Sequence, residues 1–190
     1  MVKDIVTGIR ATLVFWLITA IIYPFFLIFL GQVLFADQAN GSLIKNELGK
    51  VIGSALIGQN FTSDKYFWTR PSAINYSEGE KAQPTGISGA SNLAPSNPDL
   101  LNRVEKRSAE LNKVGIKPSA DLVYTSGSGL DPHITIESAK AQIERIAAAR
   151  SLDKNKLEIL INQNTDSRFL GIFGEPGVNV VKLNIALDKA

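Results

Sequence analysis

The chain contains no cysteine and only one histidine, His133. Without cysteine there can be no disulfide bond, no thiol nucleophile and no thiolate metal ligand. A single histidine leaves carboxylates as the remaining metal ligands, and their spacing matches no calcium-binding loop, so we predict no metal site. The 20 lysines and arginines nearly balance the 18 aspartates and glutamates and form no basic cluster, which argues against a nucleic-acid partner.

The sequence motifs of ATP hydrolysis are also missing. No stretch reads Gly-x-x-x-x-Gly-Lys-Ser/Thr, the loop that holds phosphates through its backbone N–H groups. No Asp-Lys-Thr-Gly phosphorylation motif is found either. By its own residues the chain is not an ATPase, and we predict no catalytic residue and no firmly bound cofactor.

A long stretch without charge lies near the N-terminus. Residues 11–36 carry no charged side chain and are mostly Leu, Ile, Val or Phe. About 20 apolar residues cross the hydrocarbon core of a bilayer, and this composition favours insertion by roughly 5–10 kcal/mol. We predict a short tail at residues 1–10 and a transmembrane helix at residues 11–36. Pro24 should kink this helix and direct Tyr23 toward a partner protein.

A cleaved signal peptide and a buried soluble helix are the alternatives to this anchor. The apolar run is too long for a signal peptide, and Ala36–Ala39 is a poor cleavage site. A buried soluble helix is disfavoured because the run has no polar face. Basic residues at the two ends are nearly equal in number, with Lys3 and Arg10 before the run and Lys45 and Lys50 after it. Since Arg10 directly adjoins the run, we expect a cytoplasmic N-terminus and a C-terminal domain outside.

Residues 37–190 have the length of one extracytoplasmic domain and mix strand with helix patterns. The predicted strands are Val51–Ile57, Tyr66–Trp68, Asp121–Thr125 and Val178–Leu187. The predicted helices begin at Pro98 with an Asn97 cap, after a Thr135 cap, and around Leu157–Ile161. Residues 72–97 are rich in Pro, Gly, Ser and Asn, so we expect a long irregular segment there. The fold class is therefore α+β: one transmembrane helix followed by a single mixed α+β domain.

Ser126, Ser128, Asp131 and His133 lie close together in the sequence and suggest a membrane-tethered serine hydrolase. Such catalysis needs a serine hydroxyl, a base and an orienting acid that converge in space. The nucleophile-elbow pattern Gly-x-Ser-x-Gly fails, since the first glycine would fall at Ser126. We therefore expect a tight turn ahead of a helix cap and keep the hydrolase as an alternative function.

Two further features can be explained by structure or by binding. The turn Ser126–Gly129 could hold an anion through its backbone N–H groups, although most such turns only reverse the chain. Arg70 lies two residues after Trp68, where its cation could bind a partner carboxylate or stack internally. The internal role is the simpler interpretation of Arg70.

Several stretches together resemble the C subunit of the bacterial Kdp potassium-transporting ATPase. These stretches are Gln38–Ile44, Gly53–Gln59, Tyr66-Phe67 with Arg70–Ala73, Ser88–Leu93, Asn97-Pro98, Thr125–His133, and Val178–Val180 leading to Leu183-Asn184. They follow one another in the order and spacing of that family, and they cover nearly the whole chain, the anchor included.

The resemblance implies a role in a bacterial inner-membrane complex and no catalytic centre on this chain. In that family one subunit hydrolyses ATP, and a channel-like subunit passes potassium. The C subunit is thought to stabilise the assembly and to raise the ATP affinity of the hydrolytic subunit, as a catalytic chaperone. Partner contacts are then expected at Tyr23, Pro24, Arg70 and Asn92, with residues 72–97 as a docking surface.

The resemblance also raises the question of ATP contact. Gly53–Gln59 is similar to the Gln-bearing nucleotide motif of ABC transporters, which makes Gln59 a candidate nucleotide contact. Ser126 and Ser128 of the turn that could hold an anion are the other candidates in a direct nucleotide-binding module. A domain outside the cell cannot touch cytoplasmic ATP across a bilayer about 30 Å thick. Any effect on ATP affinity would then be a coupling free energy transmitted through the membrane subunits.

Overall fold

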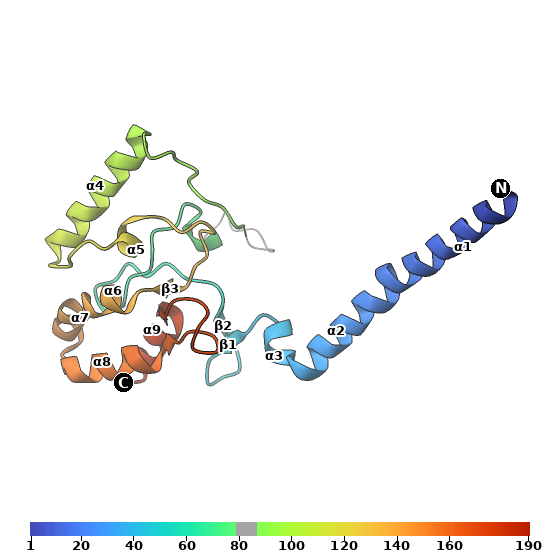
Figure 1. The fold of residues 1–190 in the computed structure, drawn as a ribbon. Coiled ribbons are helices and arrows are strands. Elements are labelled where there is room, and N and C mark those ends of the chain that lie inside the picture. Colours follow the sequence, from blue (N-terminus) through green and yellow to red (C-terminus); the bar gives the residue numbers. More distant parts are fainter. Residues whose placement is uncertain (79–86) are drawn as a thin grey trace. The chain divides into compact units, whose positions relative to one another are not determined.

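The computed structural model describes residues 1–78 and 87–190 and divides the chain into two compact units, Met1–Leu43 and Ile44–Ala190 (Figure 1). The first unit is a helical run, and the second is a mixed α+β domain. One N-terminal apolar helix followed by an α+β unit agrees with the predicted fold class. Part of the predicted irregular segment 72–97, residues 79–86, lies outside the described residues.

The N-terminal unit is helical from Val2 to Leu34 without interruption, so the residues of the predicted tail, 1–10, continue the same helix, and where the membrane-spanning part begins stays a prediction. The run is long and apolar enough to cross a membrane, and none of its most apolar window is buried. It comprises α1 (Val2–Leu17), a π-helical turn η1 (Ile18–Ile22) and α2 (Tyr23–Leu34). A one-turn helix, α3 (Ala36–Ala39), follows.

The π turn lies directly before Pro24, and the chemistry of proline explains its position. Proline has no N–H to donate, and its ring would collide with the carbonyl of Ala20 in a regular α-helix. Widening the preceding turn removes this collision while the helix continues. Pro24 therefore perturbs the helix locally through η1, and the predicted kink stays a prediction.

The second unit begins with a small two-stranded sheet and contains a second, three-stranded sheet. The first sheet joins β1 (Leu43–Lys45) and β2 (Val51–Ser54). The second has the antiparallel order β3–β5–β4, from His133–Ile134, Gly177–Asn179 and Thr165–Asp166. In its register, Val178 of the central strand β5 faces Ile134 on one side and Thr165 on the other.

Helices supply most of the remaining structure of this unit (Figure 1). They are η2 (Asn75–Ser77), α4 (Pro98–Lys113), α5 (Ala120–Val123), α6 (Ile136–Lys140), α7 (Ile143–Arg150), α8 (Lys154–Gln163) and α9 (Val180–Asp188). They surround one core of fully buried side chains. Its largest members include Phe67, Leu111, Ile116, Leu122, Ile146, Leu157, Ile161, Leu183 and Leu187.

The helix starts predicted at Asn97 and Thr135 are confirmed. The Asn97 side chain accepts a hydrogen bond from the N–H of Asp99 at 2.8 Å, and Pro98 occupies the first turn of α4. The Thr135 hydroxyl accepts the N–H of Ser138 at 3.1 Å and opens α6. These side-chain acceptors replace backbone partners that the first turn of a helix lacks.

Two of the four predicted strands are helical instead. Asp121–Thr125 mostly lies in and after α5, because the Ser119 carbonyl accepts the N–H groups of both Leu122 and Val123. Only the start of Val178–Leu187 is a strand, and its remainder is α9. The same stretch also has the spacing of a helix, since Val180, Leu183, Asn184 and Leu187 recur every three or four residues or adjoin one another and are all buried.

The other two predicted strands are only partly regular. β2 ends at Ser54, and the chain turns before Ile57. Residues 66–68 are not assigned to a strand, although Phe67 is fully buried. The backbone of Phe67 exchanges two hydrogen bonds with the Asn184 side chain, at 2.9 and 3.0 Å. The backbone of Trp68 does the same with the Gln142 side chain, at 2.7 and 3.2 Å. Two buried amides thus take the place of a neighbouring strand.

Close packing around Gly58 predicts a large effect of a single methyl group. A Cβ atom there would collide with the Tyr76 ring and lie 2.9 Å from the Asp131 carbonyl oxygen. Gly58→Ala should therefore lower the free energy of unfolding by about 1–3 kcal/mol, measured by urea denaturation of the purified chain. Gly127→Ala is the control, because a Cβ at Gly127 meets nothing within 4 Å. Equal stability of the two variants would contradict the packing described.

Candidate functional site

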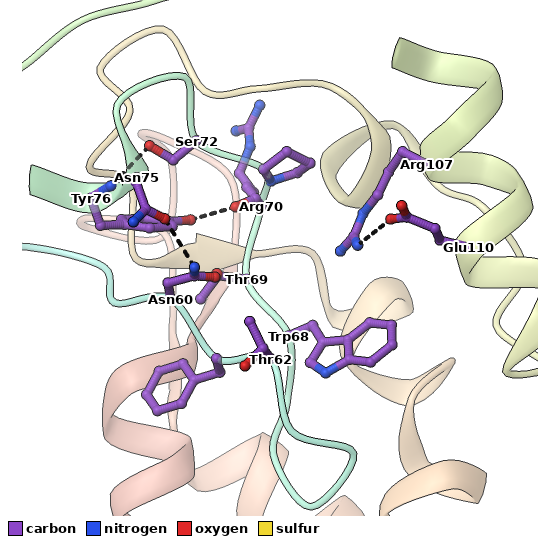
Figure 2. Close-up of a pocket in the computed structure, with 12 residues that line it drawn as sticks. Asn60, Thr62, Trp68, Thr69, Arg70, Ser72, Asn75, Tyr76, Arg107 and Glu110 are labelled. Atoms are coloured by element: carbon purple, nitrogen blue, oxygen red, sulfur yellow. Dashed lines mark hydrogen bonds and ion pairs between the residues drawn. The ribbon is translucent and has the colours of Figure 1, made fainter. Parts of the chain in front are cut away.

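A cavity of about 450 Å³ opens between the extended segment at residues 60–76 and helix α4. Figure 2 shows Asn75 and Tyr76 on one side of it, Arg107 and Glu110 of α4 on the other, and Trp68 below. Its lining residues are Asn60, Phe61, Thr62, Trp68, Thr69, Arg70, Pro71, Ser72, Asn75, Tyr76, Arg107 and Glu110. Aromatic rings, amides and paired charges thus share one recess.

A left-handed turn forms one wall of this cavity. Asn75, Tyr76 and Ser77 have consecutive φ angles of 50°, 54° and 56°. For residues other than glycine this conformation costs free energy, so surrounding contacts must impose it. The Ser72 hydroxyl accepts the N–H groups of Ile74 and Tyr76 and donates to the Gly129 carbonyl at 2.7 Å.

Tyr76 fixes the same wall from inside. Its ring is buried, and its hydroxyl donates to the Arg70 carbonyl at 2.5 Å. Burial raises the pKa of Tyr76, so the phenol stays protonated and keeps this donor at neutral pH. The Asn60 and Asn75 side chains complete the wall with a hydrogen bond of 2.9 Å (Figure 2).

Trp68 forms the floor of the cavity and supports two guanidinium groups. Arg145 lies 4.1 Å from the ring centroid and Arg107 lies 5.4 Å from it. Burial lowers the pKa of Arg145 to about 10, which leaves the group charged at neutral pH. Arg145 also donates to the carbonyls of Asp64 and Tyr66, so it fastens the extended segment to α7.

A chain of alternating charges runs from the cavity to the three-stranded sheet. Arg70 pairs with Asp131 at 3.0 Å, and Asp131 accepts the backbone N–H of His133 at 2.9 Å. The His133 ring lies between two carboxylates, with Nδ1 3.6 Å from Asp131 and Nε2 2.9 Å from Asp166. Lys182 lies 3.7 Å from the other oxygen of Asp166. Arg70 is thus held within the domain by an ion pair with Asp131, whereas the guanidinium groups over the Trp68 ring are those of Arg107 and Arg145.

These contacts shift two pKa values in opposite directions. The hydrogen bond with Asp131, and then that with Asp166, raise the pKa of His133 against the opposing effect of burial. Burial alone would raise the pKa of Asp131, but its hydrogen bonds with His133 and the charge of Arg70 lower it overall. The imidazolium and the two carboxylates therefore stabilise one another in their charged forms.

Ser126 and Ser128 serve the turn in which they lie. The buried Ser126 hydroxyl accepts the N–H of Gly129 at 2.8 Å, and the Ser128 hydroxyl accepts the N–H of Leu130 at 3.1 Å. The ring nitrogens of His133 face Asp131 and Asp166 instead of a serine. This is the tight turn before a helix cap that the sequence favoured over a hydrolase site.

Gln59 also has a structural partner. Its side-chain amide donates to the Ile52 carbonyl at 2.8 Å, which ties the residue to β2. The neighbouring Gly58 N–H donates to the Leu130 carbonyl at 2.8 Å, so Gln59 and the turn of Ser126 and Ser128 belong to adjacent segments. The three candidate nucleotide contacts are near in the fold, and whether they touch a nucleotide stays a prediction.

The predicted partner contacts are spread over both units. Tyr23 and Pro24 begin α2, where the Tyr23 ring is 57% exposed. Asn92 is exposed in the irregular segment and has a positive φ of 51°. Within that segment Ser72 and Tyr76 are built into the cavity wall, so a docking surface can comprise only its exposed part.

Asn179, Asn184, Gln142 and Arg145 were not predicted as site residues, although Asn179 and Asn184 belong to a stretch that carries the family resemblance. Buried amides have the same sequence signature as surface amides, because only the fold shows which backbone groups need a partner. Asn179 could have been recognised as a helix cap, because asparagine is a preferred residue at the start of a helix. In the structure its side chain accepts the N–H of Lys182 at 3.1 Å. Its side-chain amide also donates to the Ala55 carbonyl at 2.8 Å.

The raised pKa of His133 predicts a pH-dependent stability. A protonated His133 contributes stability in full below its unfolded pKa of about 6.5, and this contribution is lost as the pH rises through the folded pKa. The melting temperature of the wild type should therefore exceed that of His133→Gln most at acidic pH, and the difference should shrink above about pH 6.5.

Thermal unfolding of both proteins from about pH 5.5 to about pH 9 measures this difference. Asp166→Asn is the matched variant, because it removes the negative charge beside Nε2 and should shorten the pH window. Melting curves that stay equally far apart across the whole pH range would contradict the role of His133.

Comparison with known proteins identifies the family. Residues 5–189 match the family model described as KdpC, K+-transporting ATPase, c chain. A potassium-transporting ATPase KdpC subunit of Synechocystis sp. is 58% identical over the whole of both chains. KdpC subunits of Nostoc sp. and Geobacter metallireducens are 57% and 43% identical, covering 98% of this chain and 94% and 98% of their own length. The chain therefore belongs to the KdpC family, the c chain of K+-transporting ATPases.

Proposed function

We propose that the chain is a non-catalytic accessory subunit of an ATP-driven, high-affinity potassium uptake complex in a bacterial inner membrane. The observation that carries this proposal is the match over residues 5–189 to the c chain of K+-transporting ATPases. Its partners are the channel-like potassium-translocating subunit and the ATP-hydrolysing subunit of the same complex.

The helical run Val2–Leu34 anchors the subunit. Its 33 residues would extend about 50 Å, against a hydrocarbon core about 30 Å thick. None of the apolar window is buried within the chain, which supports lipid and a membrane partner as its surroundings. The widened turn before Pro24 and the exposed Tyr23 ring suit a contact with the channel-like subunit. The N-terminus is cytoplasmic and the C-terminal domain lies outside.

The subunit stabilises the assembly and raises the ATP affinity of the hydrolytic subunit from the far side of the membrane. With the domain outside, this effect is a coupling free energy: the subunit must bind more tightly to the ATP-bound state of its partners than to the ATP-free state. The partly exposed Arg70, paired with Asp131, and the exposed Asn92 are the proposed contacts that carry the preference.

A serine hydrolase and a direct nucleotide-binding module are the competing functions. The hydrogen bonds that the Ser126 and Ser128 hydroxyls accept from their own turn favour the accessory role. So does the position of His133 between two carboxylates, because a catalytic base must reach the serine hydroxyl. No ATP contact by this chain is required.

Ser128→Ala separates the three functions. Omission of the chain should raise the dissociation constant of ATP for the purified complex at least about fivefold, the lower end of usual coupling energies. Ser128→Ala should leave that constant and the potassium uptake of cells at the wild-type level, because coupling needs no Ser128 hydroxyl. The measurements are equilibrium ATP binding to each purified complex and potassium uptake by cells.

A rise in the ATP dissociation constant in Ser128→Ala would favour direct nucleotide contact, and loss of uptake alone would favour the hydrolase.

Leu48→Cys tests the topology, since Leu48 is 91% exposed and the chain has no native cysteine. A membrane-impermeant thiol reagent should label it in intact cells. Labelling only after the cells are opened would place the domain inside.

A further inference from the structure

The residues that lead from the end of β4 toward β5 are all exposed to solvent from position 166 to position 175. We call this segment, residues 166–175, the arm. Within the arm, the side chains of Arg168 and Glu175 pair at 2.8 Å, and the backbones of Phe169 and Phe173 exchange two hydrogen bonds. The arm thus has an ordered shape of its own, although none of its side chains belongs to the buried core of the domain.

One carboxylate fastens the arm to the rest of the domain. Asp166 places one oxygen 2.9 Å from Nε2 of His133 and the other 3.7 Å from Nζ of Lys182. Among the described residues, no other side chain of the arm makes a hydrogen bond or ion pair outside it. The backbone adds the short strand β4, in which Asp166 faces Gly177 of β5. The attachment of the arm therefore depends on the charge state of Asp166 and its partners.

The pair of His133 and Asp166 crosses the central strand of the three-stranded sheet. His133 lies on β3 and Asp166 on β4, the two strands that flank β5. A Cβ atom at Gly177 of β5 would lie 3.3 Å from the Cβ and 3.4 Å from the Cδ2 of His133. The glycine therefore leaves the space in which the imidazole reaches over β5 to the carboxylate on the far strand.

Charged groups from several elements face the His133 ring or its partners. They are Asp131 next to β3, Arg70 paired with Asp131, Asp166 of β4, Lys182 of α9 beside Asp166, and Asp121 and Glu175, which line the same cavity of about 200 Å³ as His133. The hydrogen bond with Asp131, and then that with Asp166, raise the pKa of His133. Of these two carboxylates only Asp166 belongs to the arm, so protonation of the ring favours the closed arm.

We propose that His133 is a pH-operated latch for the arm. When the imidazole is protonated, its ion pair with Asp166 holds β4 and the arm against β5. As the pH rises and the ring loses its proton, the ion pair becomes a weaker hydrogen bond. The arm then separates from β5 more often while the rest of the domain stays folded. This opening is local, and so it differs from the effect of His133 on unfolding of the whole domain.

Local opening is expected because the two sides of the latch differ in their packing. Ile134 of β3 and Val178 of β5 are buried in the core, whereas β4 carries only the half-buried Thr165 and the exposed Asp166. Segments with few buried apolar contacts open at a lower free energy than the core does. The weaker side of the latch is therefore β4 with the arm, and β3 stays with the domain.

Distances between two spin labels measure the position of the arm directly. Ile172→Cys on the arm and Ile159→Cys on α8 place the labels on side chains that are 72% and 56% exposed, in a chain without native cysteine. Pulsed electron paramagnetic resonance of the full-length chain at about pH 5.5 and about pH 9 gives the distribution of distances on both sides of the histidine titration. Lys140→Cys on α6 with Ile159→Cys is the control pair, since neither label lies on the arm.

The population with an open arm should be about two- to fivefold larger at the higher pH, because a partly exposed ion pair contributes modest stability. The control pair should keep one distribution at both pH values. Asp166→Asn and His133→Gln should each abolish the pH dependence of the arm, since each removes one charge of the latch. Arg168→Gln should preserve the pH dependence, because it breaks only the pair with Glu175 inside the arm.

Equal arm distances at both pH values in the otherwise native chain, or a pH dependence that survives in Asp166→Asn, would overturn the proposal. Equal broadening of the control pair would overturn it as well, because the whole domain would then loosen instead of the arm. The latch belongs to the domain alone, so its failure would leave the proposed function unaffected.

Discussion

The domain depends on giving hydrogen-bond partners to an extended segment that is buried without a neighbouring strand. Asn184 and Gln142 supply them, since each side-chain amide exchanges two hydrogen bonds with the backbone of one residue, Phe67 or Trp68. This is the pairing that one strand residue gives another in an antiparallel sheet. A buried peptide group left without a partner costs about 1–3 kcal/mol, so these amides determine where the segment can lie.

The candidate site follows from this arrangement. Asn184 of α9 and Gln142, which directly precedes α7, hold Phe67 and Trp68 in place. The following residues can then pair Arg70 with Asp131 and let the Tyr76 hydroxyl donate to the Arg70 carbonyl. The left-handed turn and the cavity wall are then imposed by packing and not by local preference. In the same domain, Ser126 and Ser128 bond within their own turn, so the part of the chain that resembles a catalytic motif serves as support for the fold.

The sequence predicts features that depend on neighbouring residues and misses those that depend on distant ones. The apolar run before Asp37 and the caps at Asn97 and Thr135 are local signals, and the structure has a helix at each. Residues 66–68 and 178–187 have the composition of strands. The backbone of Phe67 and Trp68, however, pairs with side-chain amides more than 70 positions away in the sequence. Most of residues 178–187 form helix α9, which begins at the Asn179 cap. The sequence misses the arrangement of the site for the same reason, because Arg70 meets Asp131 only after folding, across 61 positions. The orientation of the anchor depends on nearly equal charges, and it stays a prediction.

Amide hydrogen exchange at Phe67 and Trp68 measures the central pairing most directly. Both N–H groups donate to buried side-chain oxygens, at 2.9 and 2.7 Å. They should therefore exchange as slowly as the amides of the core residues Ile146 and Leu183, through opening of the whole domain. Exchange at the rate of exposed loop amides would show that the segment is not held by Asn184 and Gln142, and would contradict the account of how the domain and its site are built.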